Sequence, residues 1–280
     1  MNKLLALFIL LWVASSCVER IEVTLDETYT RLVVDGYVAT DTNVSSVTLT
    51  HSSDYFYNQP SPPVTGAQVT INDGSVVIPL VETKPGISGI YLADSSFMGE
   101  IGKTYTLEVQ LEEAINGKTD YSASCRMMSV ARLDSISFEF QPDWGKEGFW
   151  LIKIYAQEPA DEINYYLLRY YRNGVLKTDS IKKYVVSDDK YFNGSYINGL
   201  TAFYIDEQRT WETLHPGDTI MVQMSGITKE YYDFIMEVQI AGFNIPFFTG
   251  PPANVQGNID NGAIGFFSAY SNSWAKGVVK

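Results

Sequence analysis

The stretch TYTLEVQL, residues 104–111, shows most clearly the pattern from which the fold class is predicted. Its aromatic and aliphatic residues occupy every second position, and they are Tyr105, Leu107, Val109 and Leu111. Successive side chains of a β-strand point to opposite faces of the sheet. The alternation therefore predicts a strand that buries one face and leaves the other to solvent.

Comparable short stretches surround this segment on both sides. They run from residue 31 to residue 127 and are separated by turn signals such as Asn72-Asp73-Gly74 and Asn116-Gly117. Such residues tolerate the positive φ angles of tight turns. A series of short strands at this spacing predicts a β-sandwich of immunoglobulin-like architecture over residues 31–127. The Cys–Trp–Cys pattern of antibody domains is absent, so only the architecture is predicted.

Residues 128–280 predict a second β-rich domain that carries one helix. Asn173-Gly174 lies between two strand-like stretches and is a strong hairpin signal. The helix is expected near residues 228–241, with Thr228 as its N-cap and apolar residues at helical spacing after it. The predicted fold class is mainly all-β, with two β-sandwich domains and one helix packed on the second.

The N-terminus resembles the signal peptide of a bacterial lipoprotein. Lys3 precedes an apolar run over residues 4–14, which is too short to span a bilayer. Cys17 follows at the position where a lipobox places its acylated cysteine, although Ala14 stands where leucine is usual. We expect residues 1–16 to be removed, Cys17 to be lipidated and residues 17–30 to form a tether. A plain signal peptide followed by a chance cysteine is the alternative.

The composition of the chain argues against nucleic acid as a partner and against a disulfide. The formal net charge is −13 and no basic cluster occurs, so nucleic-acid binding is not expected. The chain has two cysteines. If Cys17 is acylated, Cys125 has no partner for a disulfide, and its place in a strand-like alternation predicts a buried thiol that packs as a small hydrophobe.

Several segments, taken in order, resemble one known family. The last part of the chain contains PPANV at 251–255, GNI at 257–259 and GFFSA at 265–269, and the first domain contains LVVDGYV and GKTYTLEV. In this they resemble lipoproteins that carry domain of unknown function 4249. The resemblance implies an outer-membrane lipoprotein, often encoded beside TonB-dependent receptors. It implies no catalytic residues.

The prolines and glycines of the C-terminal motif favour a structural role. They fix a tight path, and Asn258 and Asn261 are expected to hydrogen-bond their own backbone in turns. A ligand-binding loop is the alternative.

Two aromatic stretches are the candidates for ligand or partner binding. The first is Tyr55, Phe56 and Tyr57 within DYFYNQP, because tyrosine beside asparagine is favoured in recognition surfaces. The second is Phe247 and Phe248. Packing between the domains or beneath a loop is the alternative for both.

Motifs for catalysis and metal binding are weak. His51, Ser52, Ser53 and Asp54 adjoin one another in one loop, which does not favour the geometry of a catalytic triad. No zinc-type spacing occurs, and the acidic pair at residues 188–189 is interpreted as a solvated turn rather than a calcium site. No metal and no cofactor are therefore expected. A hydrolytic carboxylate pair stays open, since its separation is invisible in sequence.

Three functions follow from these observations. The leading hypothesis is a non-enzymatic lipoprotein, anchored in the outer membrane through Cys17, that assists a TonB-dependent receptor barrel in capturing or gating a substrate. The alternatives are an independent surface module that binds glycans or peptides and a carboxylate-based hydrolase. The sequence leaves open whether the body faces the periplasm or the cell exterior.

Overall fold

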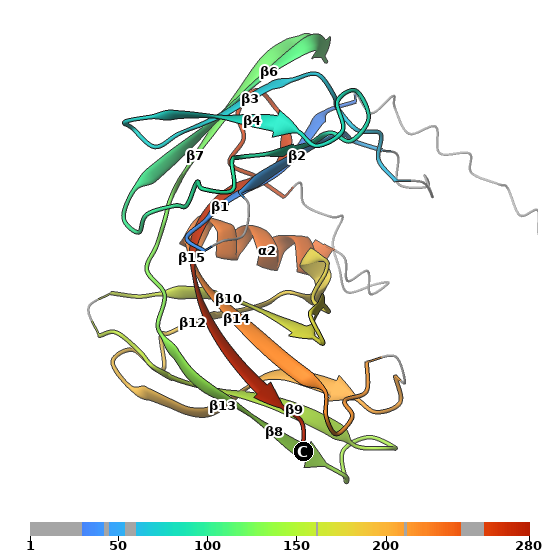
Figure 1. Ribbon diagram of the computed structural model, residues 1–280, viewed down its shortest axis with the longest axis vertical. Coiled ribbons are helices and arrows are strands. Elements are labelled where there is room, and N and C mark those ends of the chain that lie inside the picture. The colour runs from blue at the N-terminus through green and yellow to red at the C-terminus, as the bar shows by residue number, and fades with distance from the viewer. Residues whose placement is uncertain (1–29, 42–44, 54–59, 161, 210–211, 242–254) are drawn as a thin grey trace, which may run out of the picture.

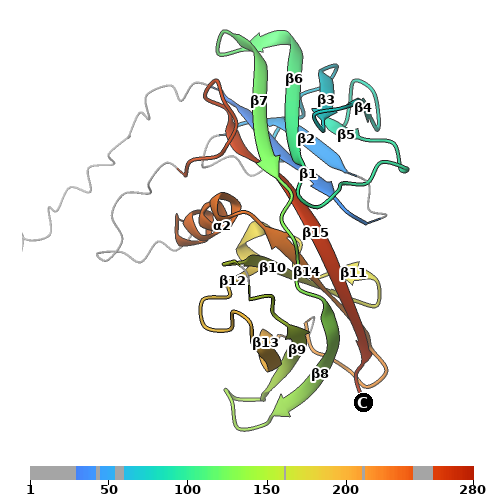
Figure 2. The same ribbon diagram turned by 90° about the vertical axis from the view of Figure 1, so that its left-hand side faces the viewer.

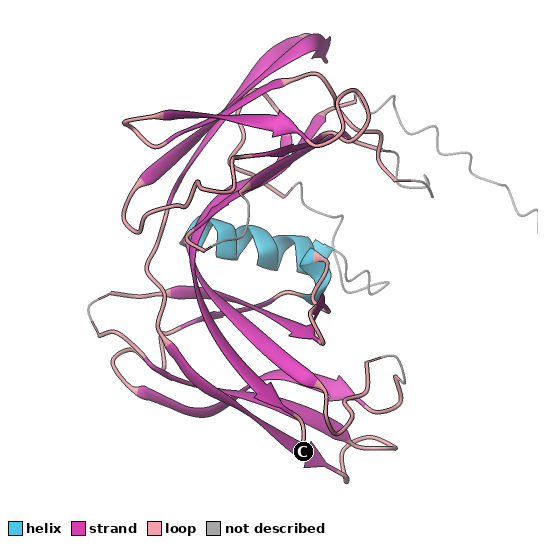
Figure 3. Ribbon diagram, viewed as in Figure 1, coloured by secondary structure: helices cyan, strands magenta, loops and turns pink. Residues whose placement is uncertain are grey.

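The structure is a computed structural model, and strands form most of what it describes. It describes residues 30–41, 45–53, 60–160, 162–209, 212–241 and 255–280. The strands fall into two lobes, one above the other in Figure 1, and one α-helix lies between them among the described residues. Figure 3 shows how strand dominates. The prediction of a mostly β-fold with a single helix is confirmed.

The N-lobe contains the first seven strands and the first half of the last one. The seven are β1 (Leu32–Ala39), β2 (Ser46–His51), β3 (Gln68–Asn72), β4 (Val77–Glu82), β5 (Ile90–Leu92), β6 (Thr104–Ile115) and β7 (Lys118–Arg126). They follow one hydrogen-bonded path in the order β1-β2-β5-β4-β3-β6-β7. In β6, Tyr105, Leu107, Val109 and Leu111 are all buried in the N-lobe core, as the alternation predicts.

The C-lobe packs a three-stranded sheet against the rest of the large sheet. Its elements are β8 (Leu133–Gln141), β9 (Phe149–Gln157), β10 (Tyr165–Arg172), β11 (Val175–Leu176), the 3-10 helix η1 (Ile181–Lys183), β12 (Val185–Asp188), β13 (Tyr196–Asp206), β14 (Thr219–Ile227) and α2 (Lys229–Ala241). The small sheet has the order β13-β9-β8, while β10 and β14 continue the large sheet. Their apolar faces enclose the second core.

The last strand, β15 (Ile264–Val278), belongs to both lobes. Its first half, from Ile264 to Tyr270, pairs in parallel with β1. Its second half, from Ser271 to Val278, pairs antiparallel with β14. Figure 2 shows this strand running from one lobe into the other. The boundary that the sequence places near residue 127 therefore does not divide the sheet, because the C-terminal segment supplies a strand and core residues to the N-lobe.

Helix α2 begins where the capping signal predicts. The backbone N–H of Tyr231 donates to Oγ1 of Thr228 at 3.3 Å, and the N–H of Tyr232 donates to the Thr228 carbonyl. Tyr231 and Ile235 are buried beneath the helix against Phe266 and its neighbours. The helix therefore covers the face of β15 that points away from the N-lobe core. In the part of the chain that the structure describes, no helix is both long and apolar enough to cross a bilayer.

Candidate functional site: the cleft between the lobes

A cleft of about 380 Å³ lies where the two lobes meet. We call it the inter-lobe cleft. Its lining comes from strands far apart in the chain. From the N-lobe strands β1, β2 and β5 it has Tyr37, Ala39, Ser46, Ile90 and Leu92. From β10, β11, β14 and β15 it has Arg169, Tyr171, Leu176, Gln223, Tyr270 and Asn272. The volume lies within the range of small-molecule sites.

The pairing register explains why polar and aromatic side chains gather there. In β1, Val34 and Val38 are buried in the N-lobe core, so the intervening Tyr37 points to the opposite face. In β10, Leu168 and Tyr170 are buried in the C-lobe core, and Arg169 points the other way. The faces left over by the two cores meet along β15 and form the floor of the cleft.

Arg169 is held among tyrosines on this floor. Its guanidinium lies 5.4 Å from the ring centroid of Tyr270 and 5.9 Å from that of Tyr184. Its Nη2 donates to the Tyr270 hydroxyl at 3.2 Å, and Tyr270 stacks on Tyr37 with centroids 5.4 Å apart. Burial raises the pKa of Tyr270, so this phenol is neutral at physiological pH. The Arg169 Nε is buried without a hydrogen-bond partner, which leaves one donor of the guanidinium unused.

A hydrogen-bond network fixes the amide side chains beside Arg169. Oδ1 of Asn272 accepts from Gln223 Nε2 at 2.7 Å and from Ser225 Oγ at 2.6 Å. Oδ2 of Asp41 accepts from Asn272 Nδ2 at 3.1 Å and from Trp274 Nε1 at 2.8 Å. Each amide therefore has a defined orientation, and the cleft presents polar groups that are already positioned for a ligand.

Asp35 adds a carboxylate to the same face of β1. Desolvation by the surrounding protein raises the pKa of Asp35, and the charge of the nearby Arg169 opposes this shift. The net shift is upward. The face thus combines one cation, one carboxylate of weakened acidity and several phenol rings.

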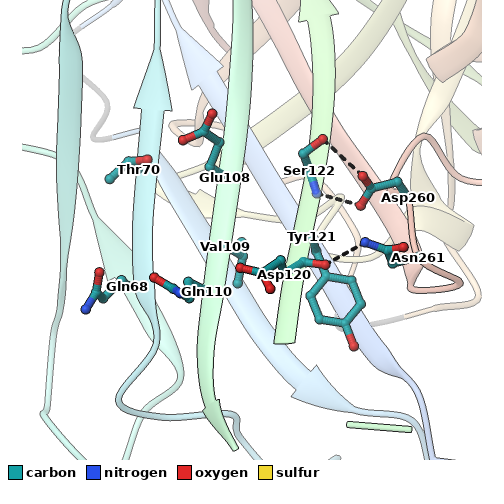
Figure 4. Close-up of a pocket in the computed structure, with 10 residues that line it drawn as sticks. All are labelled: Gln68, Thr70, Glu108, Val109, Gln110, Asp120, Tyr121, Ser122, Asp260 and Asn261. Atoms are coloured by element: carbon teal, nitrogen blue, oxygen red, sulfur yellow. Dashed lines mark hydrogen bonds between the residues drawn. The ribbon is translucent and has the colours of Figure 1, made fainter. Parts of the chain in front are cut away.

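A second hollow, of about 370 Å³, lies on the outer face of the N-lobe and is drawn in Figure 4. Gln68, Thr70, Glu108 and Gln110 project from β3 and β6, beside the edge strand β7. These are the solvent-facing residues that alternate with the buried ones in the same strands. The hollow is therefore the ordinary polar face of a half-buried sheet.

Side chains from the segment before β15 seal the free edge of β7 at this hollow. Asp260 Oδ1 accepts from the Ser122 N–H at 2.6 Å, and Asn261 Nδ2 donates to the Asp120 carbonyl at 2.7 Å. Asn258 makes two hydrogen bonds to Phe267 of β15. Its Oδ1 accepts from the Phe267 N–H, and its Nδ2 donates to the Phe267 carbonyl. These asparagines thus have the expected structural role. The expectation that they bond within local turns is wrong, since they bridge to strands instead.

The binding residues proposed from sequence lie outside the described residues. This holds for Tyr55, Phe56, Tyr57, Phe247 and Phe248, and for the lipidation candidate Cys17. The structure therefore does not place them relative to the inter-lobe cleft, and their roles stay predictions.

Two other sequence interpretations have structural outcomes. Cys125 is buried, as predicted, and burial raises the pKa of its thiol to about 11. The interpretation of residues 188–189 as a solvated turn is wrong for Asp189, which is only 2% exposed. Among the described residues, no group of three or more histidine, cysteine or acidic side chains is arranged to hold a metal ion.

Sequence reasoning missed Arg169 and Tyr270 as site residues. The stretch INYYLLRYYRNG did contain a usable signal, because its tyrosines do not follow one clean alternation. In the structure Tyr166 and Tyr170 belong to the C-lobe core, whereas Tyr171 lines the cleft. Nothing in the local sequence shows that β1 and β15 come beside this strand.

Fold and cleft together define a class: a two-lobed, mostly β-protein whose lobes share one long strand and enclose a polar, tyrosine-rich cleft. The model of the family described as "Domain of unknown function (DUF4249)" matches residues 18–274, and the chain belongs to this family. A comparison with curated proteins finds no match.

Proposed function

We propose that this chain is a lipid-anchored outer-membrane protein that captures a small polar ligand in the inter-lobe cleft and works beside a TonB-dependent receptor. The observation that carries the proposal is the convergence of the half-buried Tyr37, Arg169 and Asn272 on one cleft from strands far apart in the chain. Burying polar side chains at a lobe junction costs stability unless they serve each other or a ligand.

The chemistry of the cleft favours a ring-shaped polar ligand such as a saccharide. Tyr37 and Tyr171 line the cleft and are half-buried, so their rings offer apolar surface against which a sugar ring can pack. The half-buried Arg169 and Asn272 offer guanidinium and amide N–H groups to hydroxyl oxygens, and the buried Gln223 holds Asn272 in place. Such a combination of apolar faces and a few oriented polar groups is typical of small-molecule sites.

Blocking the cleft tests this part of the proposal. Leu176 lines the cleft from the short strand β11, and its neighbour Val175 is 59% exposed and does not line it. We expect Leu176→Trp to weaken binding to a glycan array at least about tenfold, whereas Val175→Trp binds like the native chain. Equal binding by the two variants, with both folded, would place the ligand elsewhere.

The anchor and the receptor rest on the sequence and have separate tests. Cys17→Ala should release the protein from the membrane fraction; a variant that stays bound would rule out anchoring through this cysteine. A C-terminally tagged chain, gently solubilised from the outer membrane, should co-purify with a receptor barrel in stoichiometric amount.

The second candidate function is an independent module that binds glycans or peptides without a receptor, and the composition of the cleft is what favours it. A clean monomer in the co-purification, together with glycan binding that Leu176→Trp weakens, would select this candidate. A carboxylate-based hydrolase has no such support: the buried acidic pair of Glu158 and Asp189 borders a cavity of about 20 Å³, which cannot admit a sugar.

A further inference from the structure

Two acidic side chains are buried together in the C-lobe, away from the inter-lobe cleft. Glu158 directly follows β9 and Asp189 directly follows β12, and each is only 2% exposed. Both border a cavity of about 20 Å³ that is otherwise walled mainly by apolar side chains such as Ile154 and Leu168. Acidic residues are almost never buried to this degree without a compensating partner.

The hydrogen bonds of the pair leave one oxygen of each carboxyl group without a partner. Glu158 Oε1 accepts from the Tyr166 hydroxyl at 2.6 Å. Asp189 Oδ2 accepts from Asn164 Nδ2 at 3.4 Å. Glu158 Oε2 and Asp189 Oδ1 are buried and accept from no protein group.

The surroundings do not neutralise two negative charges. The other titratable groups that line the cavity are Tyr166 on β10 and Asp188 on β12, and the described residues of its wall include no lysine, arginine or histidine. Two carboxylates that share a low-dielectric site cannot both ionise at ordinary cost. At least one of the two carboxyl groups must therefore be neutralised, by a proton or by a bound cation.

We propose that Glu158 Oε2 and Asp189 Oδ1 share a single proton and that this acid pair makes the stability of the C-lobe depend on pH. With one shared proton, each of the four carboxyl oxygens has a hydrogen-bond partner. The Tyr166 hydroxyl serves Glu158 Oε1, the Asn164 amide serves Asp189 Oδ2, and the shared proton lies between the other two oxygens. A calcium ion would need 6–8 oxygen ligands, and a cavity with mainly apolar walls does not supply them.

The pair lies where two chain segments are joined. The Asp189 N–H donates to the Asn164 carbonyl at 3.1 Å, and the Glu158 N–H donates to the Ser195 carbonyl at 3.1 Å. The shared proton therefore holds together the ends of β9 and β12 and the turns that follow them. Loss of the proton would leave two repelling carboxylates at this junction and loosen it.

The sign of the pH effect follows from the burial. Desolvation, and then the charge of Asp189, raise the pKa of Glu158 above its ordinary value of 4.5. The folded chain then holds a proton that the unfolded chain has released. The stabilisation by the pair is complete below pH 4.5 and is lost as the pH rises through the raised pKa of Glu158.

Thermal unfolding of the full chain at about pH 5 and about pH 8 tests the proposal. Glu158→Gln supplies a permanent N–H donor toward Asp189 and keeps an acceptor for Tyr166. When the pH is raised from about 5 to about 8, the unfolding temperature of the native chain should fall. We expect this fall to exceed that of Glu158→Gln by about 2–4 °C or more. The control is Glu162→Gln, an exposed glutamate of the same loop, which should follow the native chain.

Parallel pH dependence in the native chain and Glu158→Gln would overturn the proposal. If Glu158→Gln fails to fold, Asp189→Asn provides the same test from the other partner, because its amide can donate to Glu158 Oε2. A rise of the native midpoint on addition of calcium chloride, absent in Glu158→Gln, would instead identify a cation site and also overturn the shared proton.

Discussion

Replacing Phe267 by alanine should show whether β15 holds the N-lobe together. Phe267 is fully buried in the N-lobe core, although it belongs to the last strand of the chain. It lies opposite Gly36 of β1, and a Cβ on that glycine would come within 3.2 Å of the phenylalanine ring. The ring therefore fills space that the glycine leaves open, and its removal creates a cavity.

The expected loss is about 3–5 kcal/mol, the usual range for Phe→Ala in a core. Domains of this kind are stable by about 5–15 kcal/mol in total, so the variant loses a large share of its margin. Ser268→Ala on the same strand is the matched control. Its hydroxyl makes one long contact, 3.4 Å to the Gly36 carbonyl, and its loss should cost about 1 kcal/mol or less.

Urea unfolding followed by tryptophan fluorescence and by circular dichroism measures these losses. Because β15 pairs with both β1 and β14, we expect one transition that moves to lower urea with both probes. A loss below about 1.5 kcal/mol for Phe267→Ala would refute the claim that this ring is a central core contact. A separate early transition of the N-lobe alone would refute the claim that the shared strand couples the lobes.

Three further predictions concern single residues. Gly265 has φ +107°, and a Cβ there would lie 1.9 Å from a carbonyl oxygen of β1. Gly265→Ala should therefore lower the free energy of unfolding by more than the ~1–3 kcal/mol of a strained backbone. Urea unfolding measures this loss, and a neutral result would refute the geometry. The raised pKa of Cys125 keeps its thiol protonated, so peptide mass mapping should find it unmodified by iodoacetamide at about pH 8 until urea unfolds the chain. The Val76 N–H, and then the Lys103 ammonium, lower the pKa of Asp73 to about 2. The stabilisation by Asp73 is present above pH 3.8 and is lost as the pH falls toward 2. In Asp73→Asn the stability should therefore depend less on pH between these values, and an unchanged dependence in acid unfolding would contradict this.

Local patterns in the sequence specify most of the secondary structure and the class of fold. Alternation in the segment at 104–111 specifies a strand with one buried face, and the same rule applies to most strands of the N-lobe. Thr228 and the spacing after it specify α2. These patterns are local, since a strand or helix face repeats within a few residues and its end groups are satisfied by near neighbours.

The connection between the lobes, and the set of residues that lies between them, depend on tertiary packing. The sequence placed the GFFSA segment in the second domain, whereas half of β15 completes the first. Arg169 and Tyr270 are 101 residues apart and meet because two strands are brought to one sheet. Asp189 reads as a surface turn in the sequence, yet packing buries it beside Glu158. Each of these outcomes depends on pairing between distant segments, which local periodicity does not encode.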